Sequence, residues 1–293
     1  MRKSQVLLAL VIVLFLCCGN LASAQTPVQM EKNIFYGEGS PEDNPAHVLD
    51  VYRPESGKNL PVVMFLDGGD QIDRDRENWV RVGRMLAVND IVAVMIDYRP
   101  SPGHKHPAQV EDAALAFAWV KKNIHKYRGS PDMVFVVGHS WGAHIAAMLV
   151  GDSRYLEKVG HSPEDVYGGV FLSGFYYLAP GLDPWNPPSD GKVYRDMILP
   201  AFGDVHDDLK KASPASYVRA DMPPILILHA QMESEFFKAQ ARAYYREMEK
   251  AGAPVQLEMI PGRNHFTLIN KFGVTGDPTL EKINHFIKFR SYD

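Results

Sequence analysis

The pentapeptide Gly138-His139-Ser140-Trp141-Gly142 constrains this chain more than any other feature. It follows an apolar run at 133–137 that predicts a buried strand, and it precedes residues 143–150, which predict a helix. A Gly-x-Ser-x-Gly motif between a strand and a helix is typical of a nucleophile elbow, a sharp turn that presents the serine hydroxyl. The two glycines let the strand and the helix pass closely, with no side chain between them. We therefore expect Ser140 to be a nucleophile.

The first 24 residues have the pattern of a secretory signal peptide. Arg2 and Lys3 form a basic start, residues 6–18 are apolar, and residues 22–24 form a small-residue cleavage motif. The apolar run is short for a transmembrane helix. We expect cleavage after Ala24 and export to the periplasm or the medium, with no stable membrane anchor afterwards. An uncleaved N-terminal anchor is the alternative.

Residues 25–293 are expected to form a single domain. The chain is 46% hydrophobic and 23% charged, which is typical of a globular domain with a sizeable core. Both cysteines lie in the signal segment, so the exported chain has no disulfide and no thiol nucleophile. Without Arg2 and Lys3 it has 29 basic and 35 acidic residues, a formal charge of −6. No basic cluster indicates nucleic acid as a partner.

Strands and helices are expected to alternate along the chain. Apolar runs predict strands at 47–52, 61–66, 91–96, 133–137, 169–173, 225–228 and 255–260. Helices are expected at 78–88, 110–124, 143–150, 236–251 and 279–288. Gly252 is expected to end the helix at 236–251. This order predicts an α/β fold, with a mostly parallel central sheet and helices on both faces.

Residues 174–212 depart from the alternation. Five prolines and many aromatic residues lie between Ser173 and Ser213. Long irregular insertions in compact domains are often functional. We expect a small cap insertion that shapes the substrate site, and a well-packed surface excursion is the alternative.

The other parts of a serine hydrolase site should follow in a set chain order, first an acid and then a histidine. His265 lies in the loop after the last expected strand, where it would act as the general base. The loop after the strand at 225–228 contains no aspartate, so a glutamate must serve as the acid. Glu233 is the expected acid, and Glu235 is the alternative.

Two backbone N–H groups are needed to stabilise the negative oxygen of the reaction intermediate. Trp141, directly after the nucleophile, is expected to supply one. The loop after the strand at 61–66 reads Asp-Gly-Gly-Asp and is expected to supply the other. Within this loop Gly69 is the first candidate donor and Asp70 is the second.

Several motifs between residues 48 and 266 resemble the esterase and kynurenine formamidase branch of the α/β-hydrolases. Residues 48–54 resemble the run LDxYxP, residues 97–112 resemble NYRLxP…HPAxxED, residues 138–144 resemble GHSAGAH, residues 172–176 resemble LSGxYD, and residues 231–236 resemble the formamidase acid loop QxDSxEF. The resemblance implies an α/β-hydrolase fold. It also supports Glu233 as the acid.

The chain departs from the family pattern at three positions. Asp67 stands where the family has a histidine, Trp141 replaces a small residue beside the nucleophile, and Glu233 replaces an aspartate. Asp67 is expected to alter how the oxyanion loop is braced, and an indole beside the serine is expected to narrow the space for an acyl group. Both changes bear on the substrate more than on the reaction. The family likeness makes His106 part of a structural lead into a helix, so no metal is expected.

Together these residues imply a secreted serine carboxylesterase with a Ser140–His265–Glu233 triad and an acyl-serine intermediate. The expected partner is a small, apolar or aromatic ester, and no cofactor is expected. Hydrolysis of an N-formyl arylamine is the alternative reaction. A non-catalytic binding module that kept the fold is the alternative from a different class. The sequence leaves the acyl and alcohol preferences and the oligomeric state open.

Overall fold

The computed structural model describes residues 27–68, 76–179, 191 and 194–291. Three sequence predictions concern residues that lie wholly or partly outside these ranges. The expected signal segment, the candidate oxyanion donors Gly69 and Asp70, and residues 180–190 of the expected cap lie outside the described residues. Among the helices of the described part, none is long and apolar enough to cross a membrane.

Eight strands form one sheet in the order β1-β2-β4-β3-β5-β6-β7-β8. The strands are β1 (Val28–Phe35), β2 (Val48–Pro54), β3 (Leu60–Leu66), β4 (Val92–Ile96), β5 (Gly129–His139), β6 (Gly168–Leu172), β7 (Ile225–Ala230) and β8 (Val255–Ile260). The pairs β1–β2 and β2–β4 are antiparallel, and all other neighbours are parallel. The expected mostly parallel sheet is therefore confirmed, and the carboxyl ends of β3 and of β5 to β8 meet along one edge.

The sequence analysis missed strand β1. Its residues read VQMEKNIF and are mostly exposed, so they show no apolar run or regular alternation. The strand forms through its antiparallel pairing with β2 at the edge of the sheet. Pairing of this kind is a tertiary interaction that local sequence pattern does not reveal.

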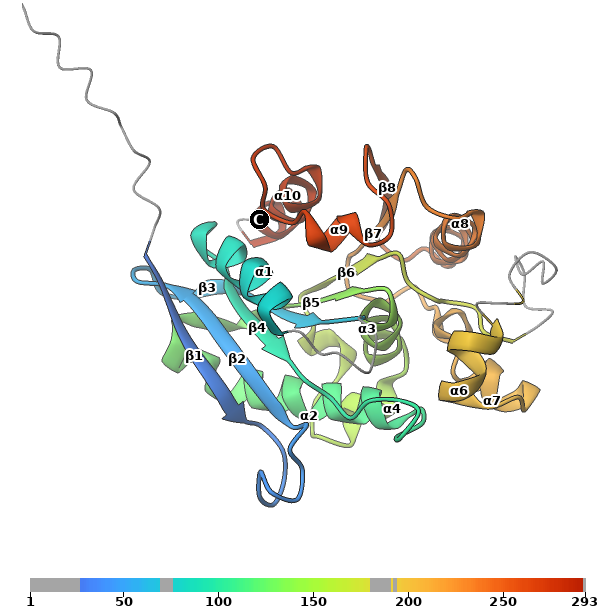
Figure 1. The fold of residues 1–293 in the computed structure, drawn as a ribbon, viewed down its shortest axis with the longest axis horizontal. Helices are drawn as coiled ribbons and strands as arrows, with labels where there is room; N and C mark the ends of the chain where they lie inside the picture. The colour runs from blue at the N-terminus through green and yellow to red at the C-terminus, as the bar shows by residue number, and fades with distance from the viewer. Residues whose placement is uncertain (1–26, 69–75, 180–190, 192–193, 292–293) are drawn as a thin grey trace, which may run out of the picture.

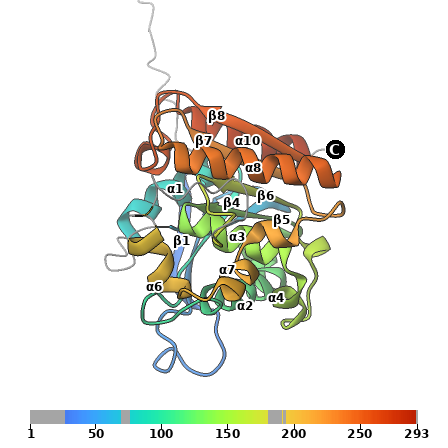
Figure 2. The ribbon, with the colours of Figure 1, turned by 90° about the vertical axis from the view of Figure 1, so that its right-hand side faces the viewer.

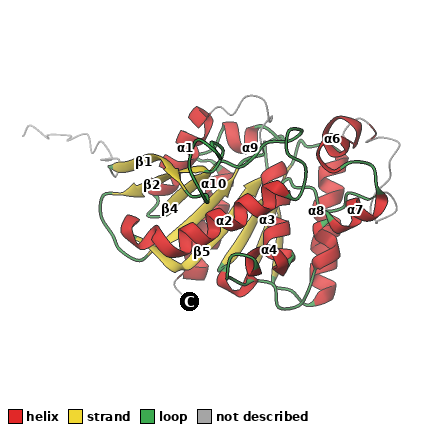
Figure 3. Ribbon diagram, turned by 90° about the horizontal axis from the view of Figure 1, so that it is seen from below, coloured by secondary structure: helices red, strands yellow, loops and turns green. Residues whose placement is uncertain are grey.

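Helices cover both faces of the sheet, as expected (Figures 1 and 3). The longer helices are α1 (Arg76–Val88), α2 (Ala108–Asn123), α3 (Trp141–Gly151), α8 (Glu235–Ala251) and α10 (Pro278–Ser291). The short helices are α4 (Ser153–Glu157), α6 (Leu199–Phe202), α7 (His206–Lys211) and α9 (Thr267–Asn270). Helix α8 ends at Gly252, which has a φ of 81°, as the sequence predicted.

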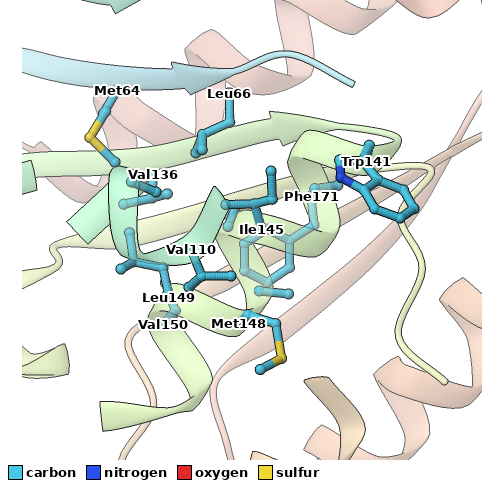
Figure 4. Packing of buried hydrophobic residues seen from close by; sticks show 14 of the residues in the cluster. Met64, Leu66, Val110, Val136, Trp141, Ile145, Met148, Leu149, Val150 and Phe171 are labelled. Carbon is cyan, nitrogen blue, oxygen red and sulfur yellow. The ribbon is translucent and has the colours of Figure 1, made fainter. Parts of the chain in front are cut away.

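The alternation of side chains along the strands creates two cores. In β3, Val62, Met64 and Leu66 belong to the core beneath α2, α3 and α8. Val63 and Phe65 point to the opposite face, in the core beneath α1 and α10. Figure 4 shows the first core, in which side chains of β3 and β5 pack against those of α2 and α3. Because both faces of these strands are covered, they are apolar throughout.

The described part of residues 174–212 is compact. Residues 175–179 are buried, and Gln240 of α8 accepts hydrogen bonds from the N–H groups of Tyr176 and Tyr177. A single π-helical turn, Tyr194–Ile198, leads into α6, and α7 follows. Figures 1 and 2 show α6 and α7 outside the sheet, on the side where α3 and α8 lie. The role of this segment as a cap stays a prediction.

The turn between β5 and α3 brings three backbone segments into direct contact. A Cβ atom on Gly138 would lie 2.2 Å from the carbonyl oxygen of Gly142. A Cβ atom on Gly142 would lie 2.1 Å from the carbonyl oxygen of Leu66, at the end of β3. Only glycine allows approaches this close. The strand, the turn and the helix are therefore locked together at the carboxyl edge of the sheet.

Replacing Gly142 by alanine should destabilise the fold by about 3 kcal/mol or more, because its methyl group would overlap a buried backbone carbonyl. Urea denaturation measures the change. Gly103→Ala is the matched control, since a Cβ atom there would lie 3.7 Å from its nearest neighbour. Equal stability of the two variants would contradict the packing described here.

Candidate active site

Ser140 sits in a strained turn at the centre of the sheet edge. Its φ of 55° and ψ of −113° are unusual for a residue with a side chain. The turn is held from the side, because the Ser140 N–H donates to the carbonyl of Leu172 at the end of β6, 2.8 Å away. This geometry matches the predicted nucleophile elbow, with the serine between strand β5 and helix α3.

The hydroxyl of Ser140 starts a chain of hydrogen bonds. Its Oγ lies 2.9 Å from Nε2 of His265, and Nδ1 of His265 lies 2.7 Å from Oε1 of Glu233. A carboxylate only accepts, so Nδ1 carries the proton and Nε2 is free to accept from the serine. Oε2 of Glu233 accepts from the N–H of Ala230, 2.9 Å away. The structure thus brings together the three residues that the sequence selected as a triad.

Glu233 and Glu235 lie in different environments. The side chain of Glu233 is fully buried, whereas that of Glu235 is 76% exposed. Glu235 forms ion pairs with Lys238 and Arg242 on the surface of α8. Of the two glutamates that the sequence left open, only Glu233 contacts His265 in the structure.

The loops that carry the acid and the histidine are joined to each other. Gln231 accepts from the N–H of Gly262 at 2.9 Å, and the N–H of Met232 donates to the carbonyl of Arg263 at 2.8 Å. These bonds extend the parallel pairing of β7 and β8 past the ends of both strands. The spacing between Glu233 and His265 is therefore set by backbone geometry.

His139, which precedes the nucleophile, supports the histidine. Its Nε2 lies 2.9 Å from the carbonyl oxygen of His265, so a neutral His139 donates to that carbonyl. On the other side, the Phe237 ring lies 4.3 Å from the His265 ring. The sequence analysis gave neither residue a role, because only the tertiary fold brings them to His265.

One predicted oxyanion donor, Trp141, lies in the described part of the chain. Its N–H belongs to the first residue of α3, and the first N–H groups of a helix have no partner within that helix. A Cβ atom on Gly68 would lie 2.6 Å from this nitrogen and 2.7 Å from Cβ of Ser140. The start of the loop after β3 therefore lies directly beside the turn. Gly69 and Asp70, the two donors expected from that loop, are outside the described residues.

A buried polar network braces the loop at Asp67, where the chain departs from the family that it resembles. The Tyr98 hydroxyl donates to the Asp67 carbonyl. The next residue, Arg99, binds Asp112 through both its backbone N–H and its guanidinium. His47 contacts the same buried carboxylate at 2.9 Å. These motif residues hold Tyr98 against the loop, a role that the sequence did not reveal.

His106, just before α2, and Glu111, in its first turns, each contact neighbouring side chains. The His106 ring packs against the Phe202 ring, with centroids 5.2 Å apart. Glu111 forms an ion pair with Lys158 at 3.0 Å. Throughout the described ranges, no group of three or more histidine, cysteine, aspartate or glutamate side chains is arranged to hold a metal ion.

Three histidines around the site are kept neutral by burial. Burial lowers the pKa of His139 and of His144 from 6.5 to about 3, and neighbouring histidines add to the effect. Burial also lowers the pKa of His106, to about 4. His144 donates through Nδ1 to the carbonyl of Phe175, 3.0 Å away, which orients it one turn after Ser140.

These shifts make stability depend on pH. In the folded state the pKa is lowered, so below pH 6.5 the unfolded chain binds protons that the folded chain does not. The stability that each neutral, buried histidine contributes to the folded state is present above pH 6.5 and is lost as the pH falls below that value. His144→Asn keeps a donor for Phe175 but does not titrate, so its stability should fall less than that of the wild type between pH 7 and 5. The expected difference in unfolding free energy is about 2 kcal/mol.

Urea unfolding at the two pH values measures this difference. His125→Asn is the control, because His125 is exposed to solvent and its replacement should leave the wild-type slope in place. If the unfolding free energy of His144→Asn fell between pH 7 and 5 as much as that of the wild type, a neutral, buried His144 would be contradicted.

The fold agrees with comparisons to known proteins. Residues 63–269 match the family described as alpha/beta hydrolase fold. The chain is 28% identical over 269 residues to a probable isoprenylcysteine alpha-carbonyl methylesterase of Oryza sativa subsp. japonica, which covers 87% of this chain and 62% of that protein. It is 30% identical over 250 residues to the esterase LipQ of Mycobacterium tuberculosis, which covers 80% of this chain and 56% of that protein. The chain thus spans less than two thirds of the length of these curated relatives.

Solved structures share the same architecture. The structure of a Pyrobaculum calidifontis esterase superposes with a TM-score of 0.72 at 25% sequence identity, and the match covers 90% of this chain and 87% of that one. The family match takes in more than half of the chain. The protein therefore belongs to the family with the alpha/beta hydrolase fold, as its sequence motifs implied.

Proposed function

We propose that this protein is a serine esterase that hydrolyses small carboxylic esters through an acyl-serine intermediate. The observation that carries the proposal is the continuous hydrogen-bond chain from Ser140 through His265 to Glu233. The names of the curated relatives, an esterase and a probable methylesterase, support the same chemistry. So does the esterase with a similar structure.

In the first half-reaction, Ser140 Oγ attacks the ester carbonyl while His265 Nε2 takes its proton. The buried carboxylate of Glu233 orients the ring and stabilises the imidazolium that forms. The carbonyl oxygen becomes negative and accepts from the Trp141 N–H. When the intermediate collapses, His265 gives its proton to the departing alkoxide. Water then attacks the acyl group by the same steps and regenerates Ser140.

Turnover of p-nitrophenyl acetate tests the roles of these residues. Ser140→Ala should lower kcat at least about a thousandfold, because the nucleophile is absent. Glu233→Gln should also lower kcat at least about a hundredfold, since the amide does not stabilise the imidazolium. Glu235→Gln is the matched control and should keep wild-type turnover, because Glu235 is exposed and paired with surface cations.

A fluorophosphonate probe should label the wild type at Ser140 in the same samples. Retention of most activity in Ser140→Ala would sink the esterase assignment. Labelling at Ser140 with turnover of N-formylkynurenine in place of esters would favour the formamide alternative. A folded protein that the probe does not label would favour the binding module.

We also propose that the protein is exported. The support is the sequence of residues 1–24, with its basic start, apolar run and small-residue motif. N-terminal sequencing of the protein recovered from the periplasm or medium should begin at Gln25. Recovery of the intact Met1 terminus from the cytoplasm would contradict export.

A further inference from the structure

We propose that the site, acting as the esterase proposed above, takes esters with a short acyl group and a larger apolar alcohol. The inference rests on that proposed function and adds to it which half of the substrate can be large. Two groups of side chains carry it. The aromatic wall consists of Trp141, Phe175 and Phe202, and the exposed apolar pair consists of Met232 and Phe266.

The triad determines the side on which each half of the ester lies. In the tetrahedral intermediate the carbon is bonded to Ser140 Oγ, the negative oxygen, the leaving oxygen and the acyl group. The leaving oxygen must face Nε2 of His265, because that nitrogen delivers its proton. The negative oxygen faces the N–H of Trp141. The acyl group occupies the remaining direction, which we assign to the side of Ser140 away from His265.

The aromatic wall limits this acyl side. The Trp141 side chain starts on the residue whose N–H would hold the negative oxygen, so its indole lies within one side-chain length of the reacting carbon. In Figure 4, Trp141 stands at the end of the core cluster, apart from Met64 and Val136. Trp141 is only 3% exposed.

The indole is also held in place. The Phe202 ring of α6 lies 5.2 Å from it, and the fully buried ring of Phe175 lies 5.7 Å from it in an edge-on arrangement. The His144 ring lies 5.7 Å away on the same helix. In interiors packed in this way, the insertion of extra methylenes displaces side chains and costs free energy. A long acyl chain would have to displace these rings, whereas an acetyl group would not.

The leaving-group side has the opposite character. Phe266 follows His265 directly and is 69% exposed, and its ring centroid lies 5.4 Å from that of the His265 ring. Met232 precedes Glu233 and is 60% exposed. The backbone bond from Met232 to Arg263 holds the two loops side by side. We assign these exposed apolar side chains as contacts for the apolar alcohol, which then requires no buried space.

Two isomeric esters separate the two sides. Hexyl acetate and ethyl hexanoate have the same composition, but the six-carbon chain is on the alcohol in the first and on the acyl group in the second. The wild type should hydrolyse hexyl acetate with a kcat/KM at least about tenfold higher than that for ethyl hexanoate, because acyl methylenes that do not fit the site raise the barrier to reaction. A pH-stat assay measures both substrates without a chromogenic group.

Variants of the wall and of the exposed pair should both lower the ratio of kcat/KM for hexyl acetate to that for ethyl hexanoate, the first through ethyl hexanoate and the second through hexyl acetate. Trp141→Ala should lower the ratio at least about fivefold by raising kcat/KM for ethyl hexanoate, since the backbone N–H remains while the indole is removed. Phe202→Ala should act in the same direction and serves as a second variant. Phe266→Ser should raise KM for hexyl acetate several-fold. Phe289→Ser is the control, because Phe289 is 61% exposed on α10, where its ring stacks on that of His285.

The outcomes distinguish this inference from the esterase proposal itself. A wild type that is labelled by the fluorophosphonate but prefers ethyl hexanoate would overturn the inference and leave the esterase intact. The same holds if folded Trp141→Ala and Phe202→Ala both keep the wild-type ratio. Absence of both labelling and ester turnover would instead overturn the proposed function.

Discussion

The site depends on the close approach of three backbone segments, the end of β3, the turn at Ser140 and the first turn of α3. Gly138, Gly142 and Gly68 each lie where a Cβ atom would overlap neighbouring backbone. Because the contacts are between main-chain atoms, they leave little freedom for the turn, and they hold Ser140 at a φ of 55°. This packing presents the serine hydroxyl at the sheet edge and brings the Trp141 N–H beside it. The strained backbone conformation of Ser140 is therefore maintained by the packing of the sheet against the turn, and not by the site residues alone.

The histidine and the acid reach the serine by a second set of backbone contacts. Strands β6, β7 and β8 pair in parallel beside β5, so their following loops arise along one edge. Bonds from Gly262 to Gln231 and from Met232 to Arg263 keep two of these loops in register. Burial of the Glu233 carboxylate is tolerated because both of its oxygens accept hydrogen bonds. The same packing keeps His139 neutral, and as a neutral donor it supports His265.

Much of this arrangement was predictable from sequence, for a physical reason. Strands buried on both faces read as unbroken apolar runs, so β3, β4, β5 and β7 were visible, and chain order then selected Ser140, His265 and Glu233. The edge strand β1 was not visible, because exposed residues carry no apolar pattern. The support from His139, Tyr98 and Gly68 was also missed, since it joins segments far apart in the chain. Sequence spacing indicates the candidate reacting groups, whereas tertiary contacts determine how they are held.

The measurement that tests the central claim most directly is acid-quenched trapping of the acyl group. The protein is mixed with p-nitrophenyl acetate, quenched within the first turnover, digested and analysed by mass spectrometry. If Ser140 is the nucleophile oriented by His265 and Glu233, the acetyl group should appear on Ser140, together with a burst of nitrophenol close to one per protein molecule. Steady turnover with the acetyl group on another residue, or with no acetylated peptide and no burst, would contradict the account.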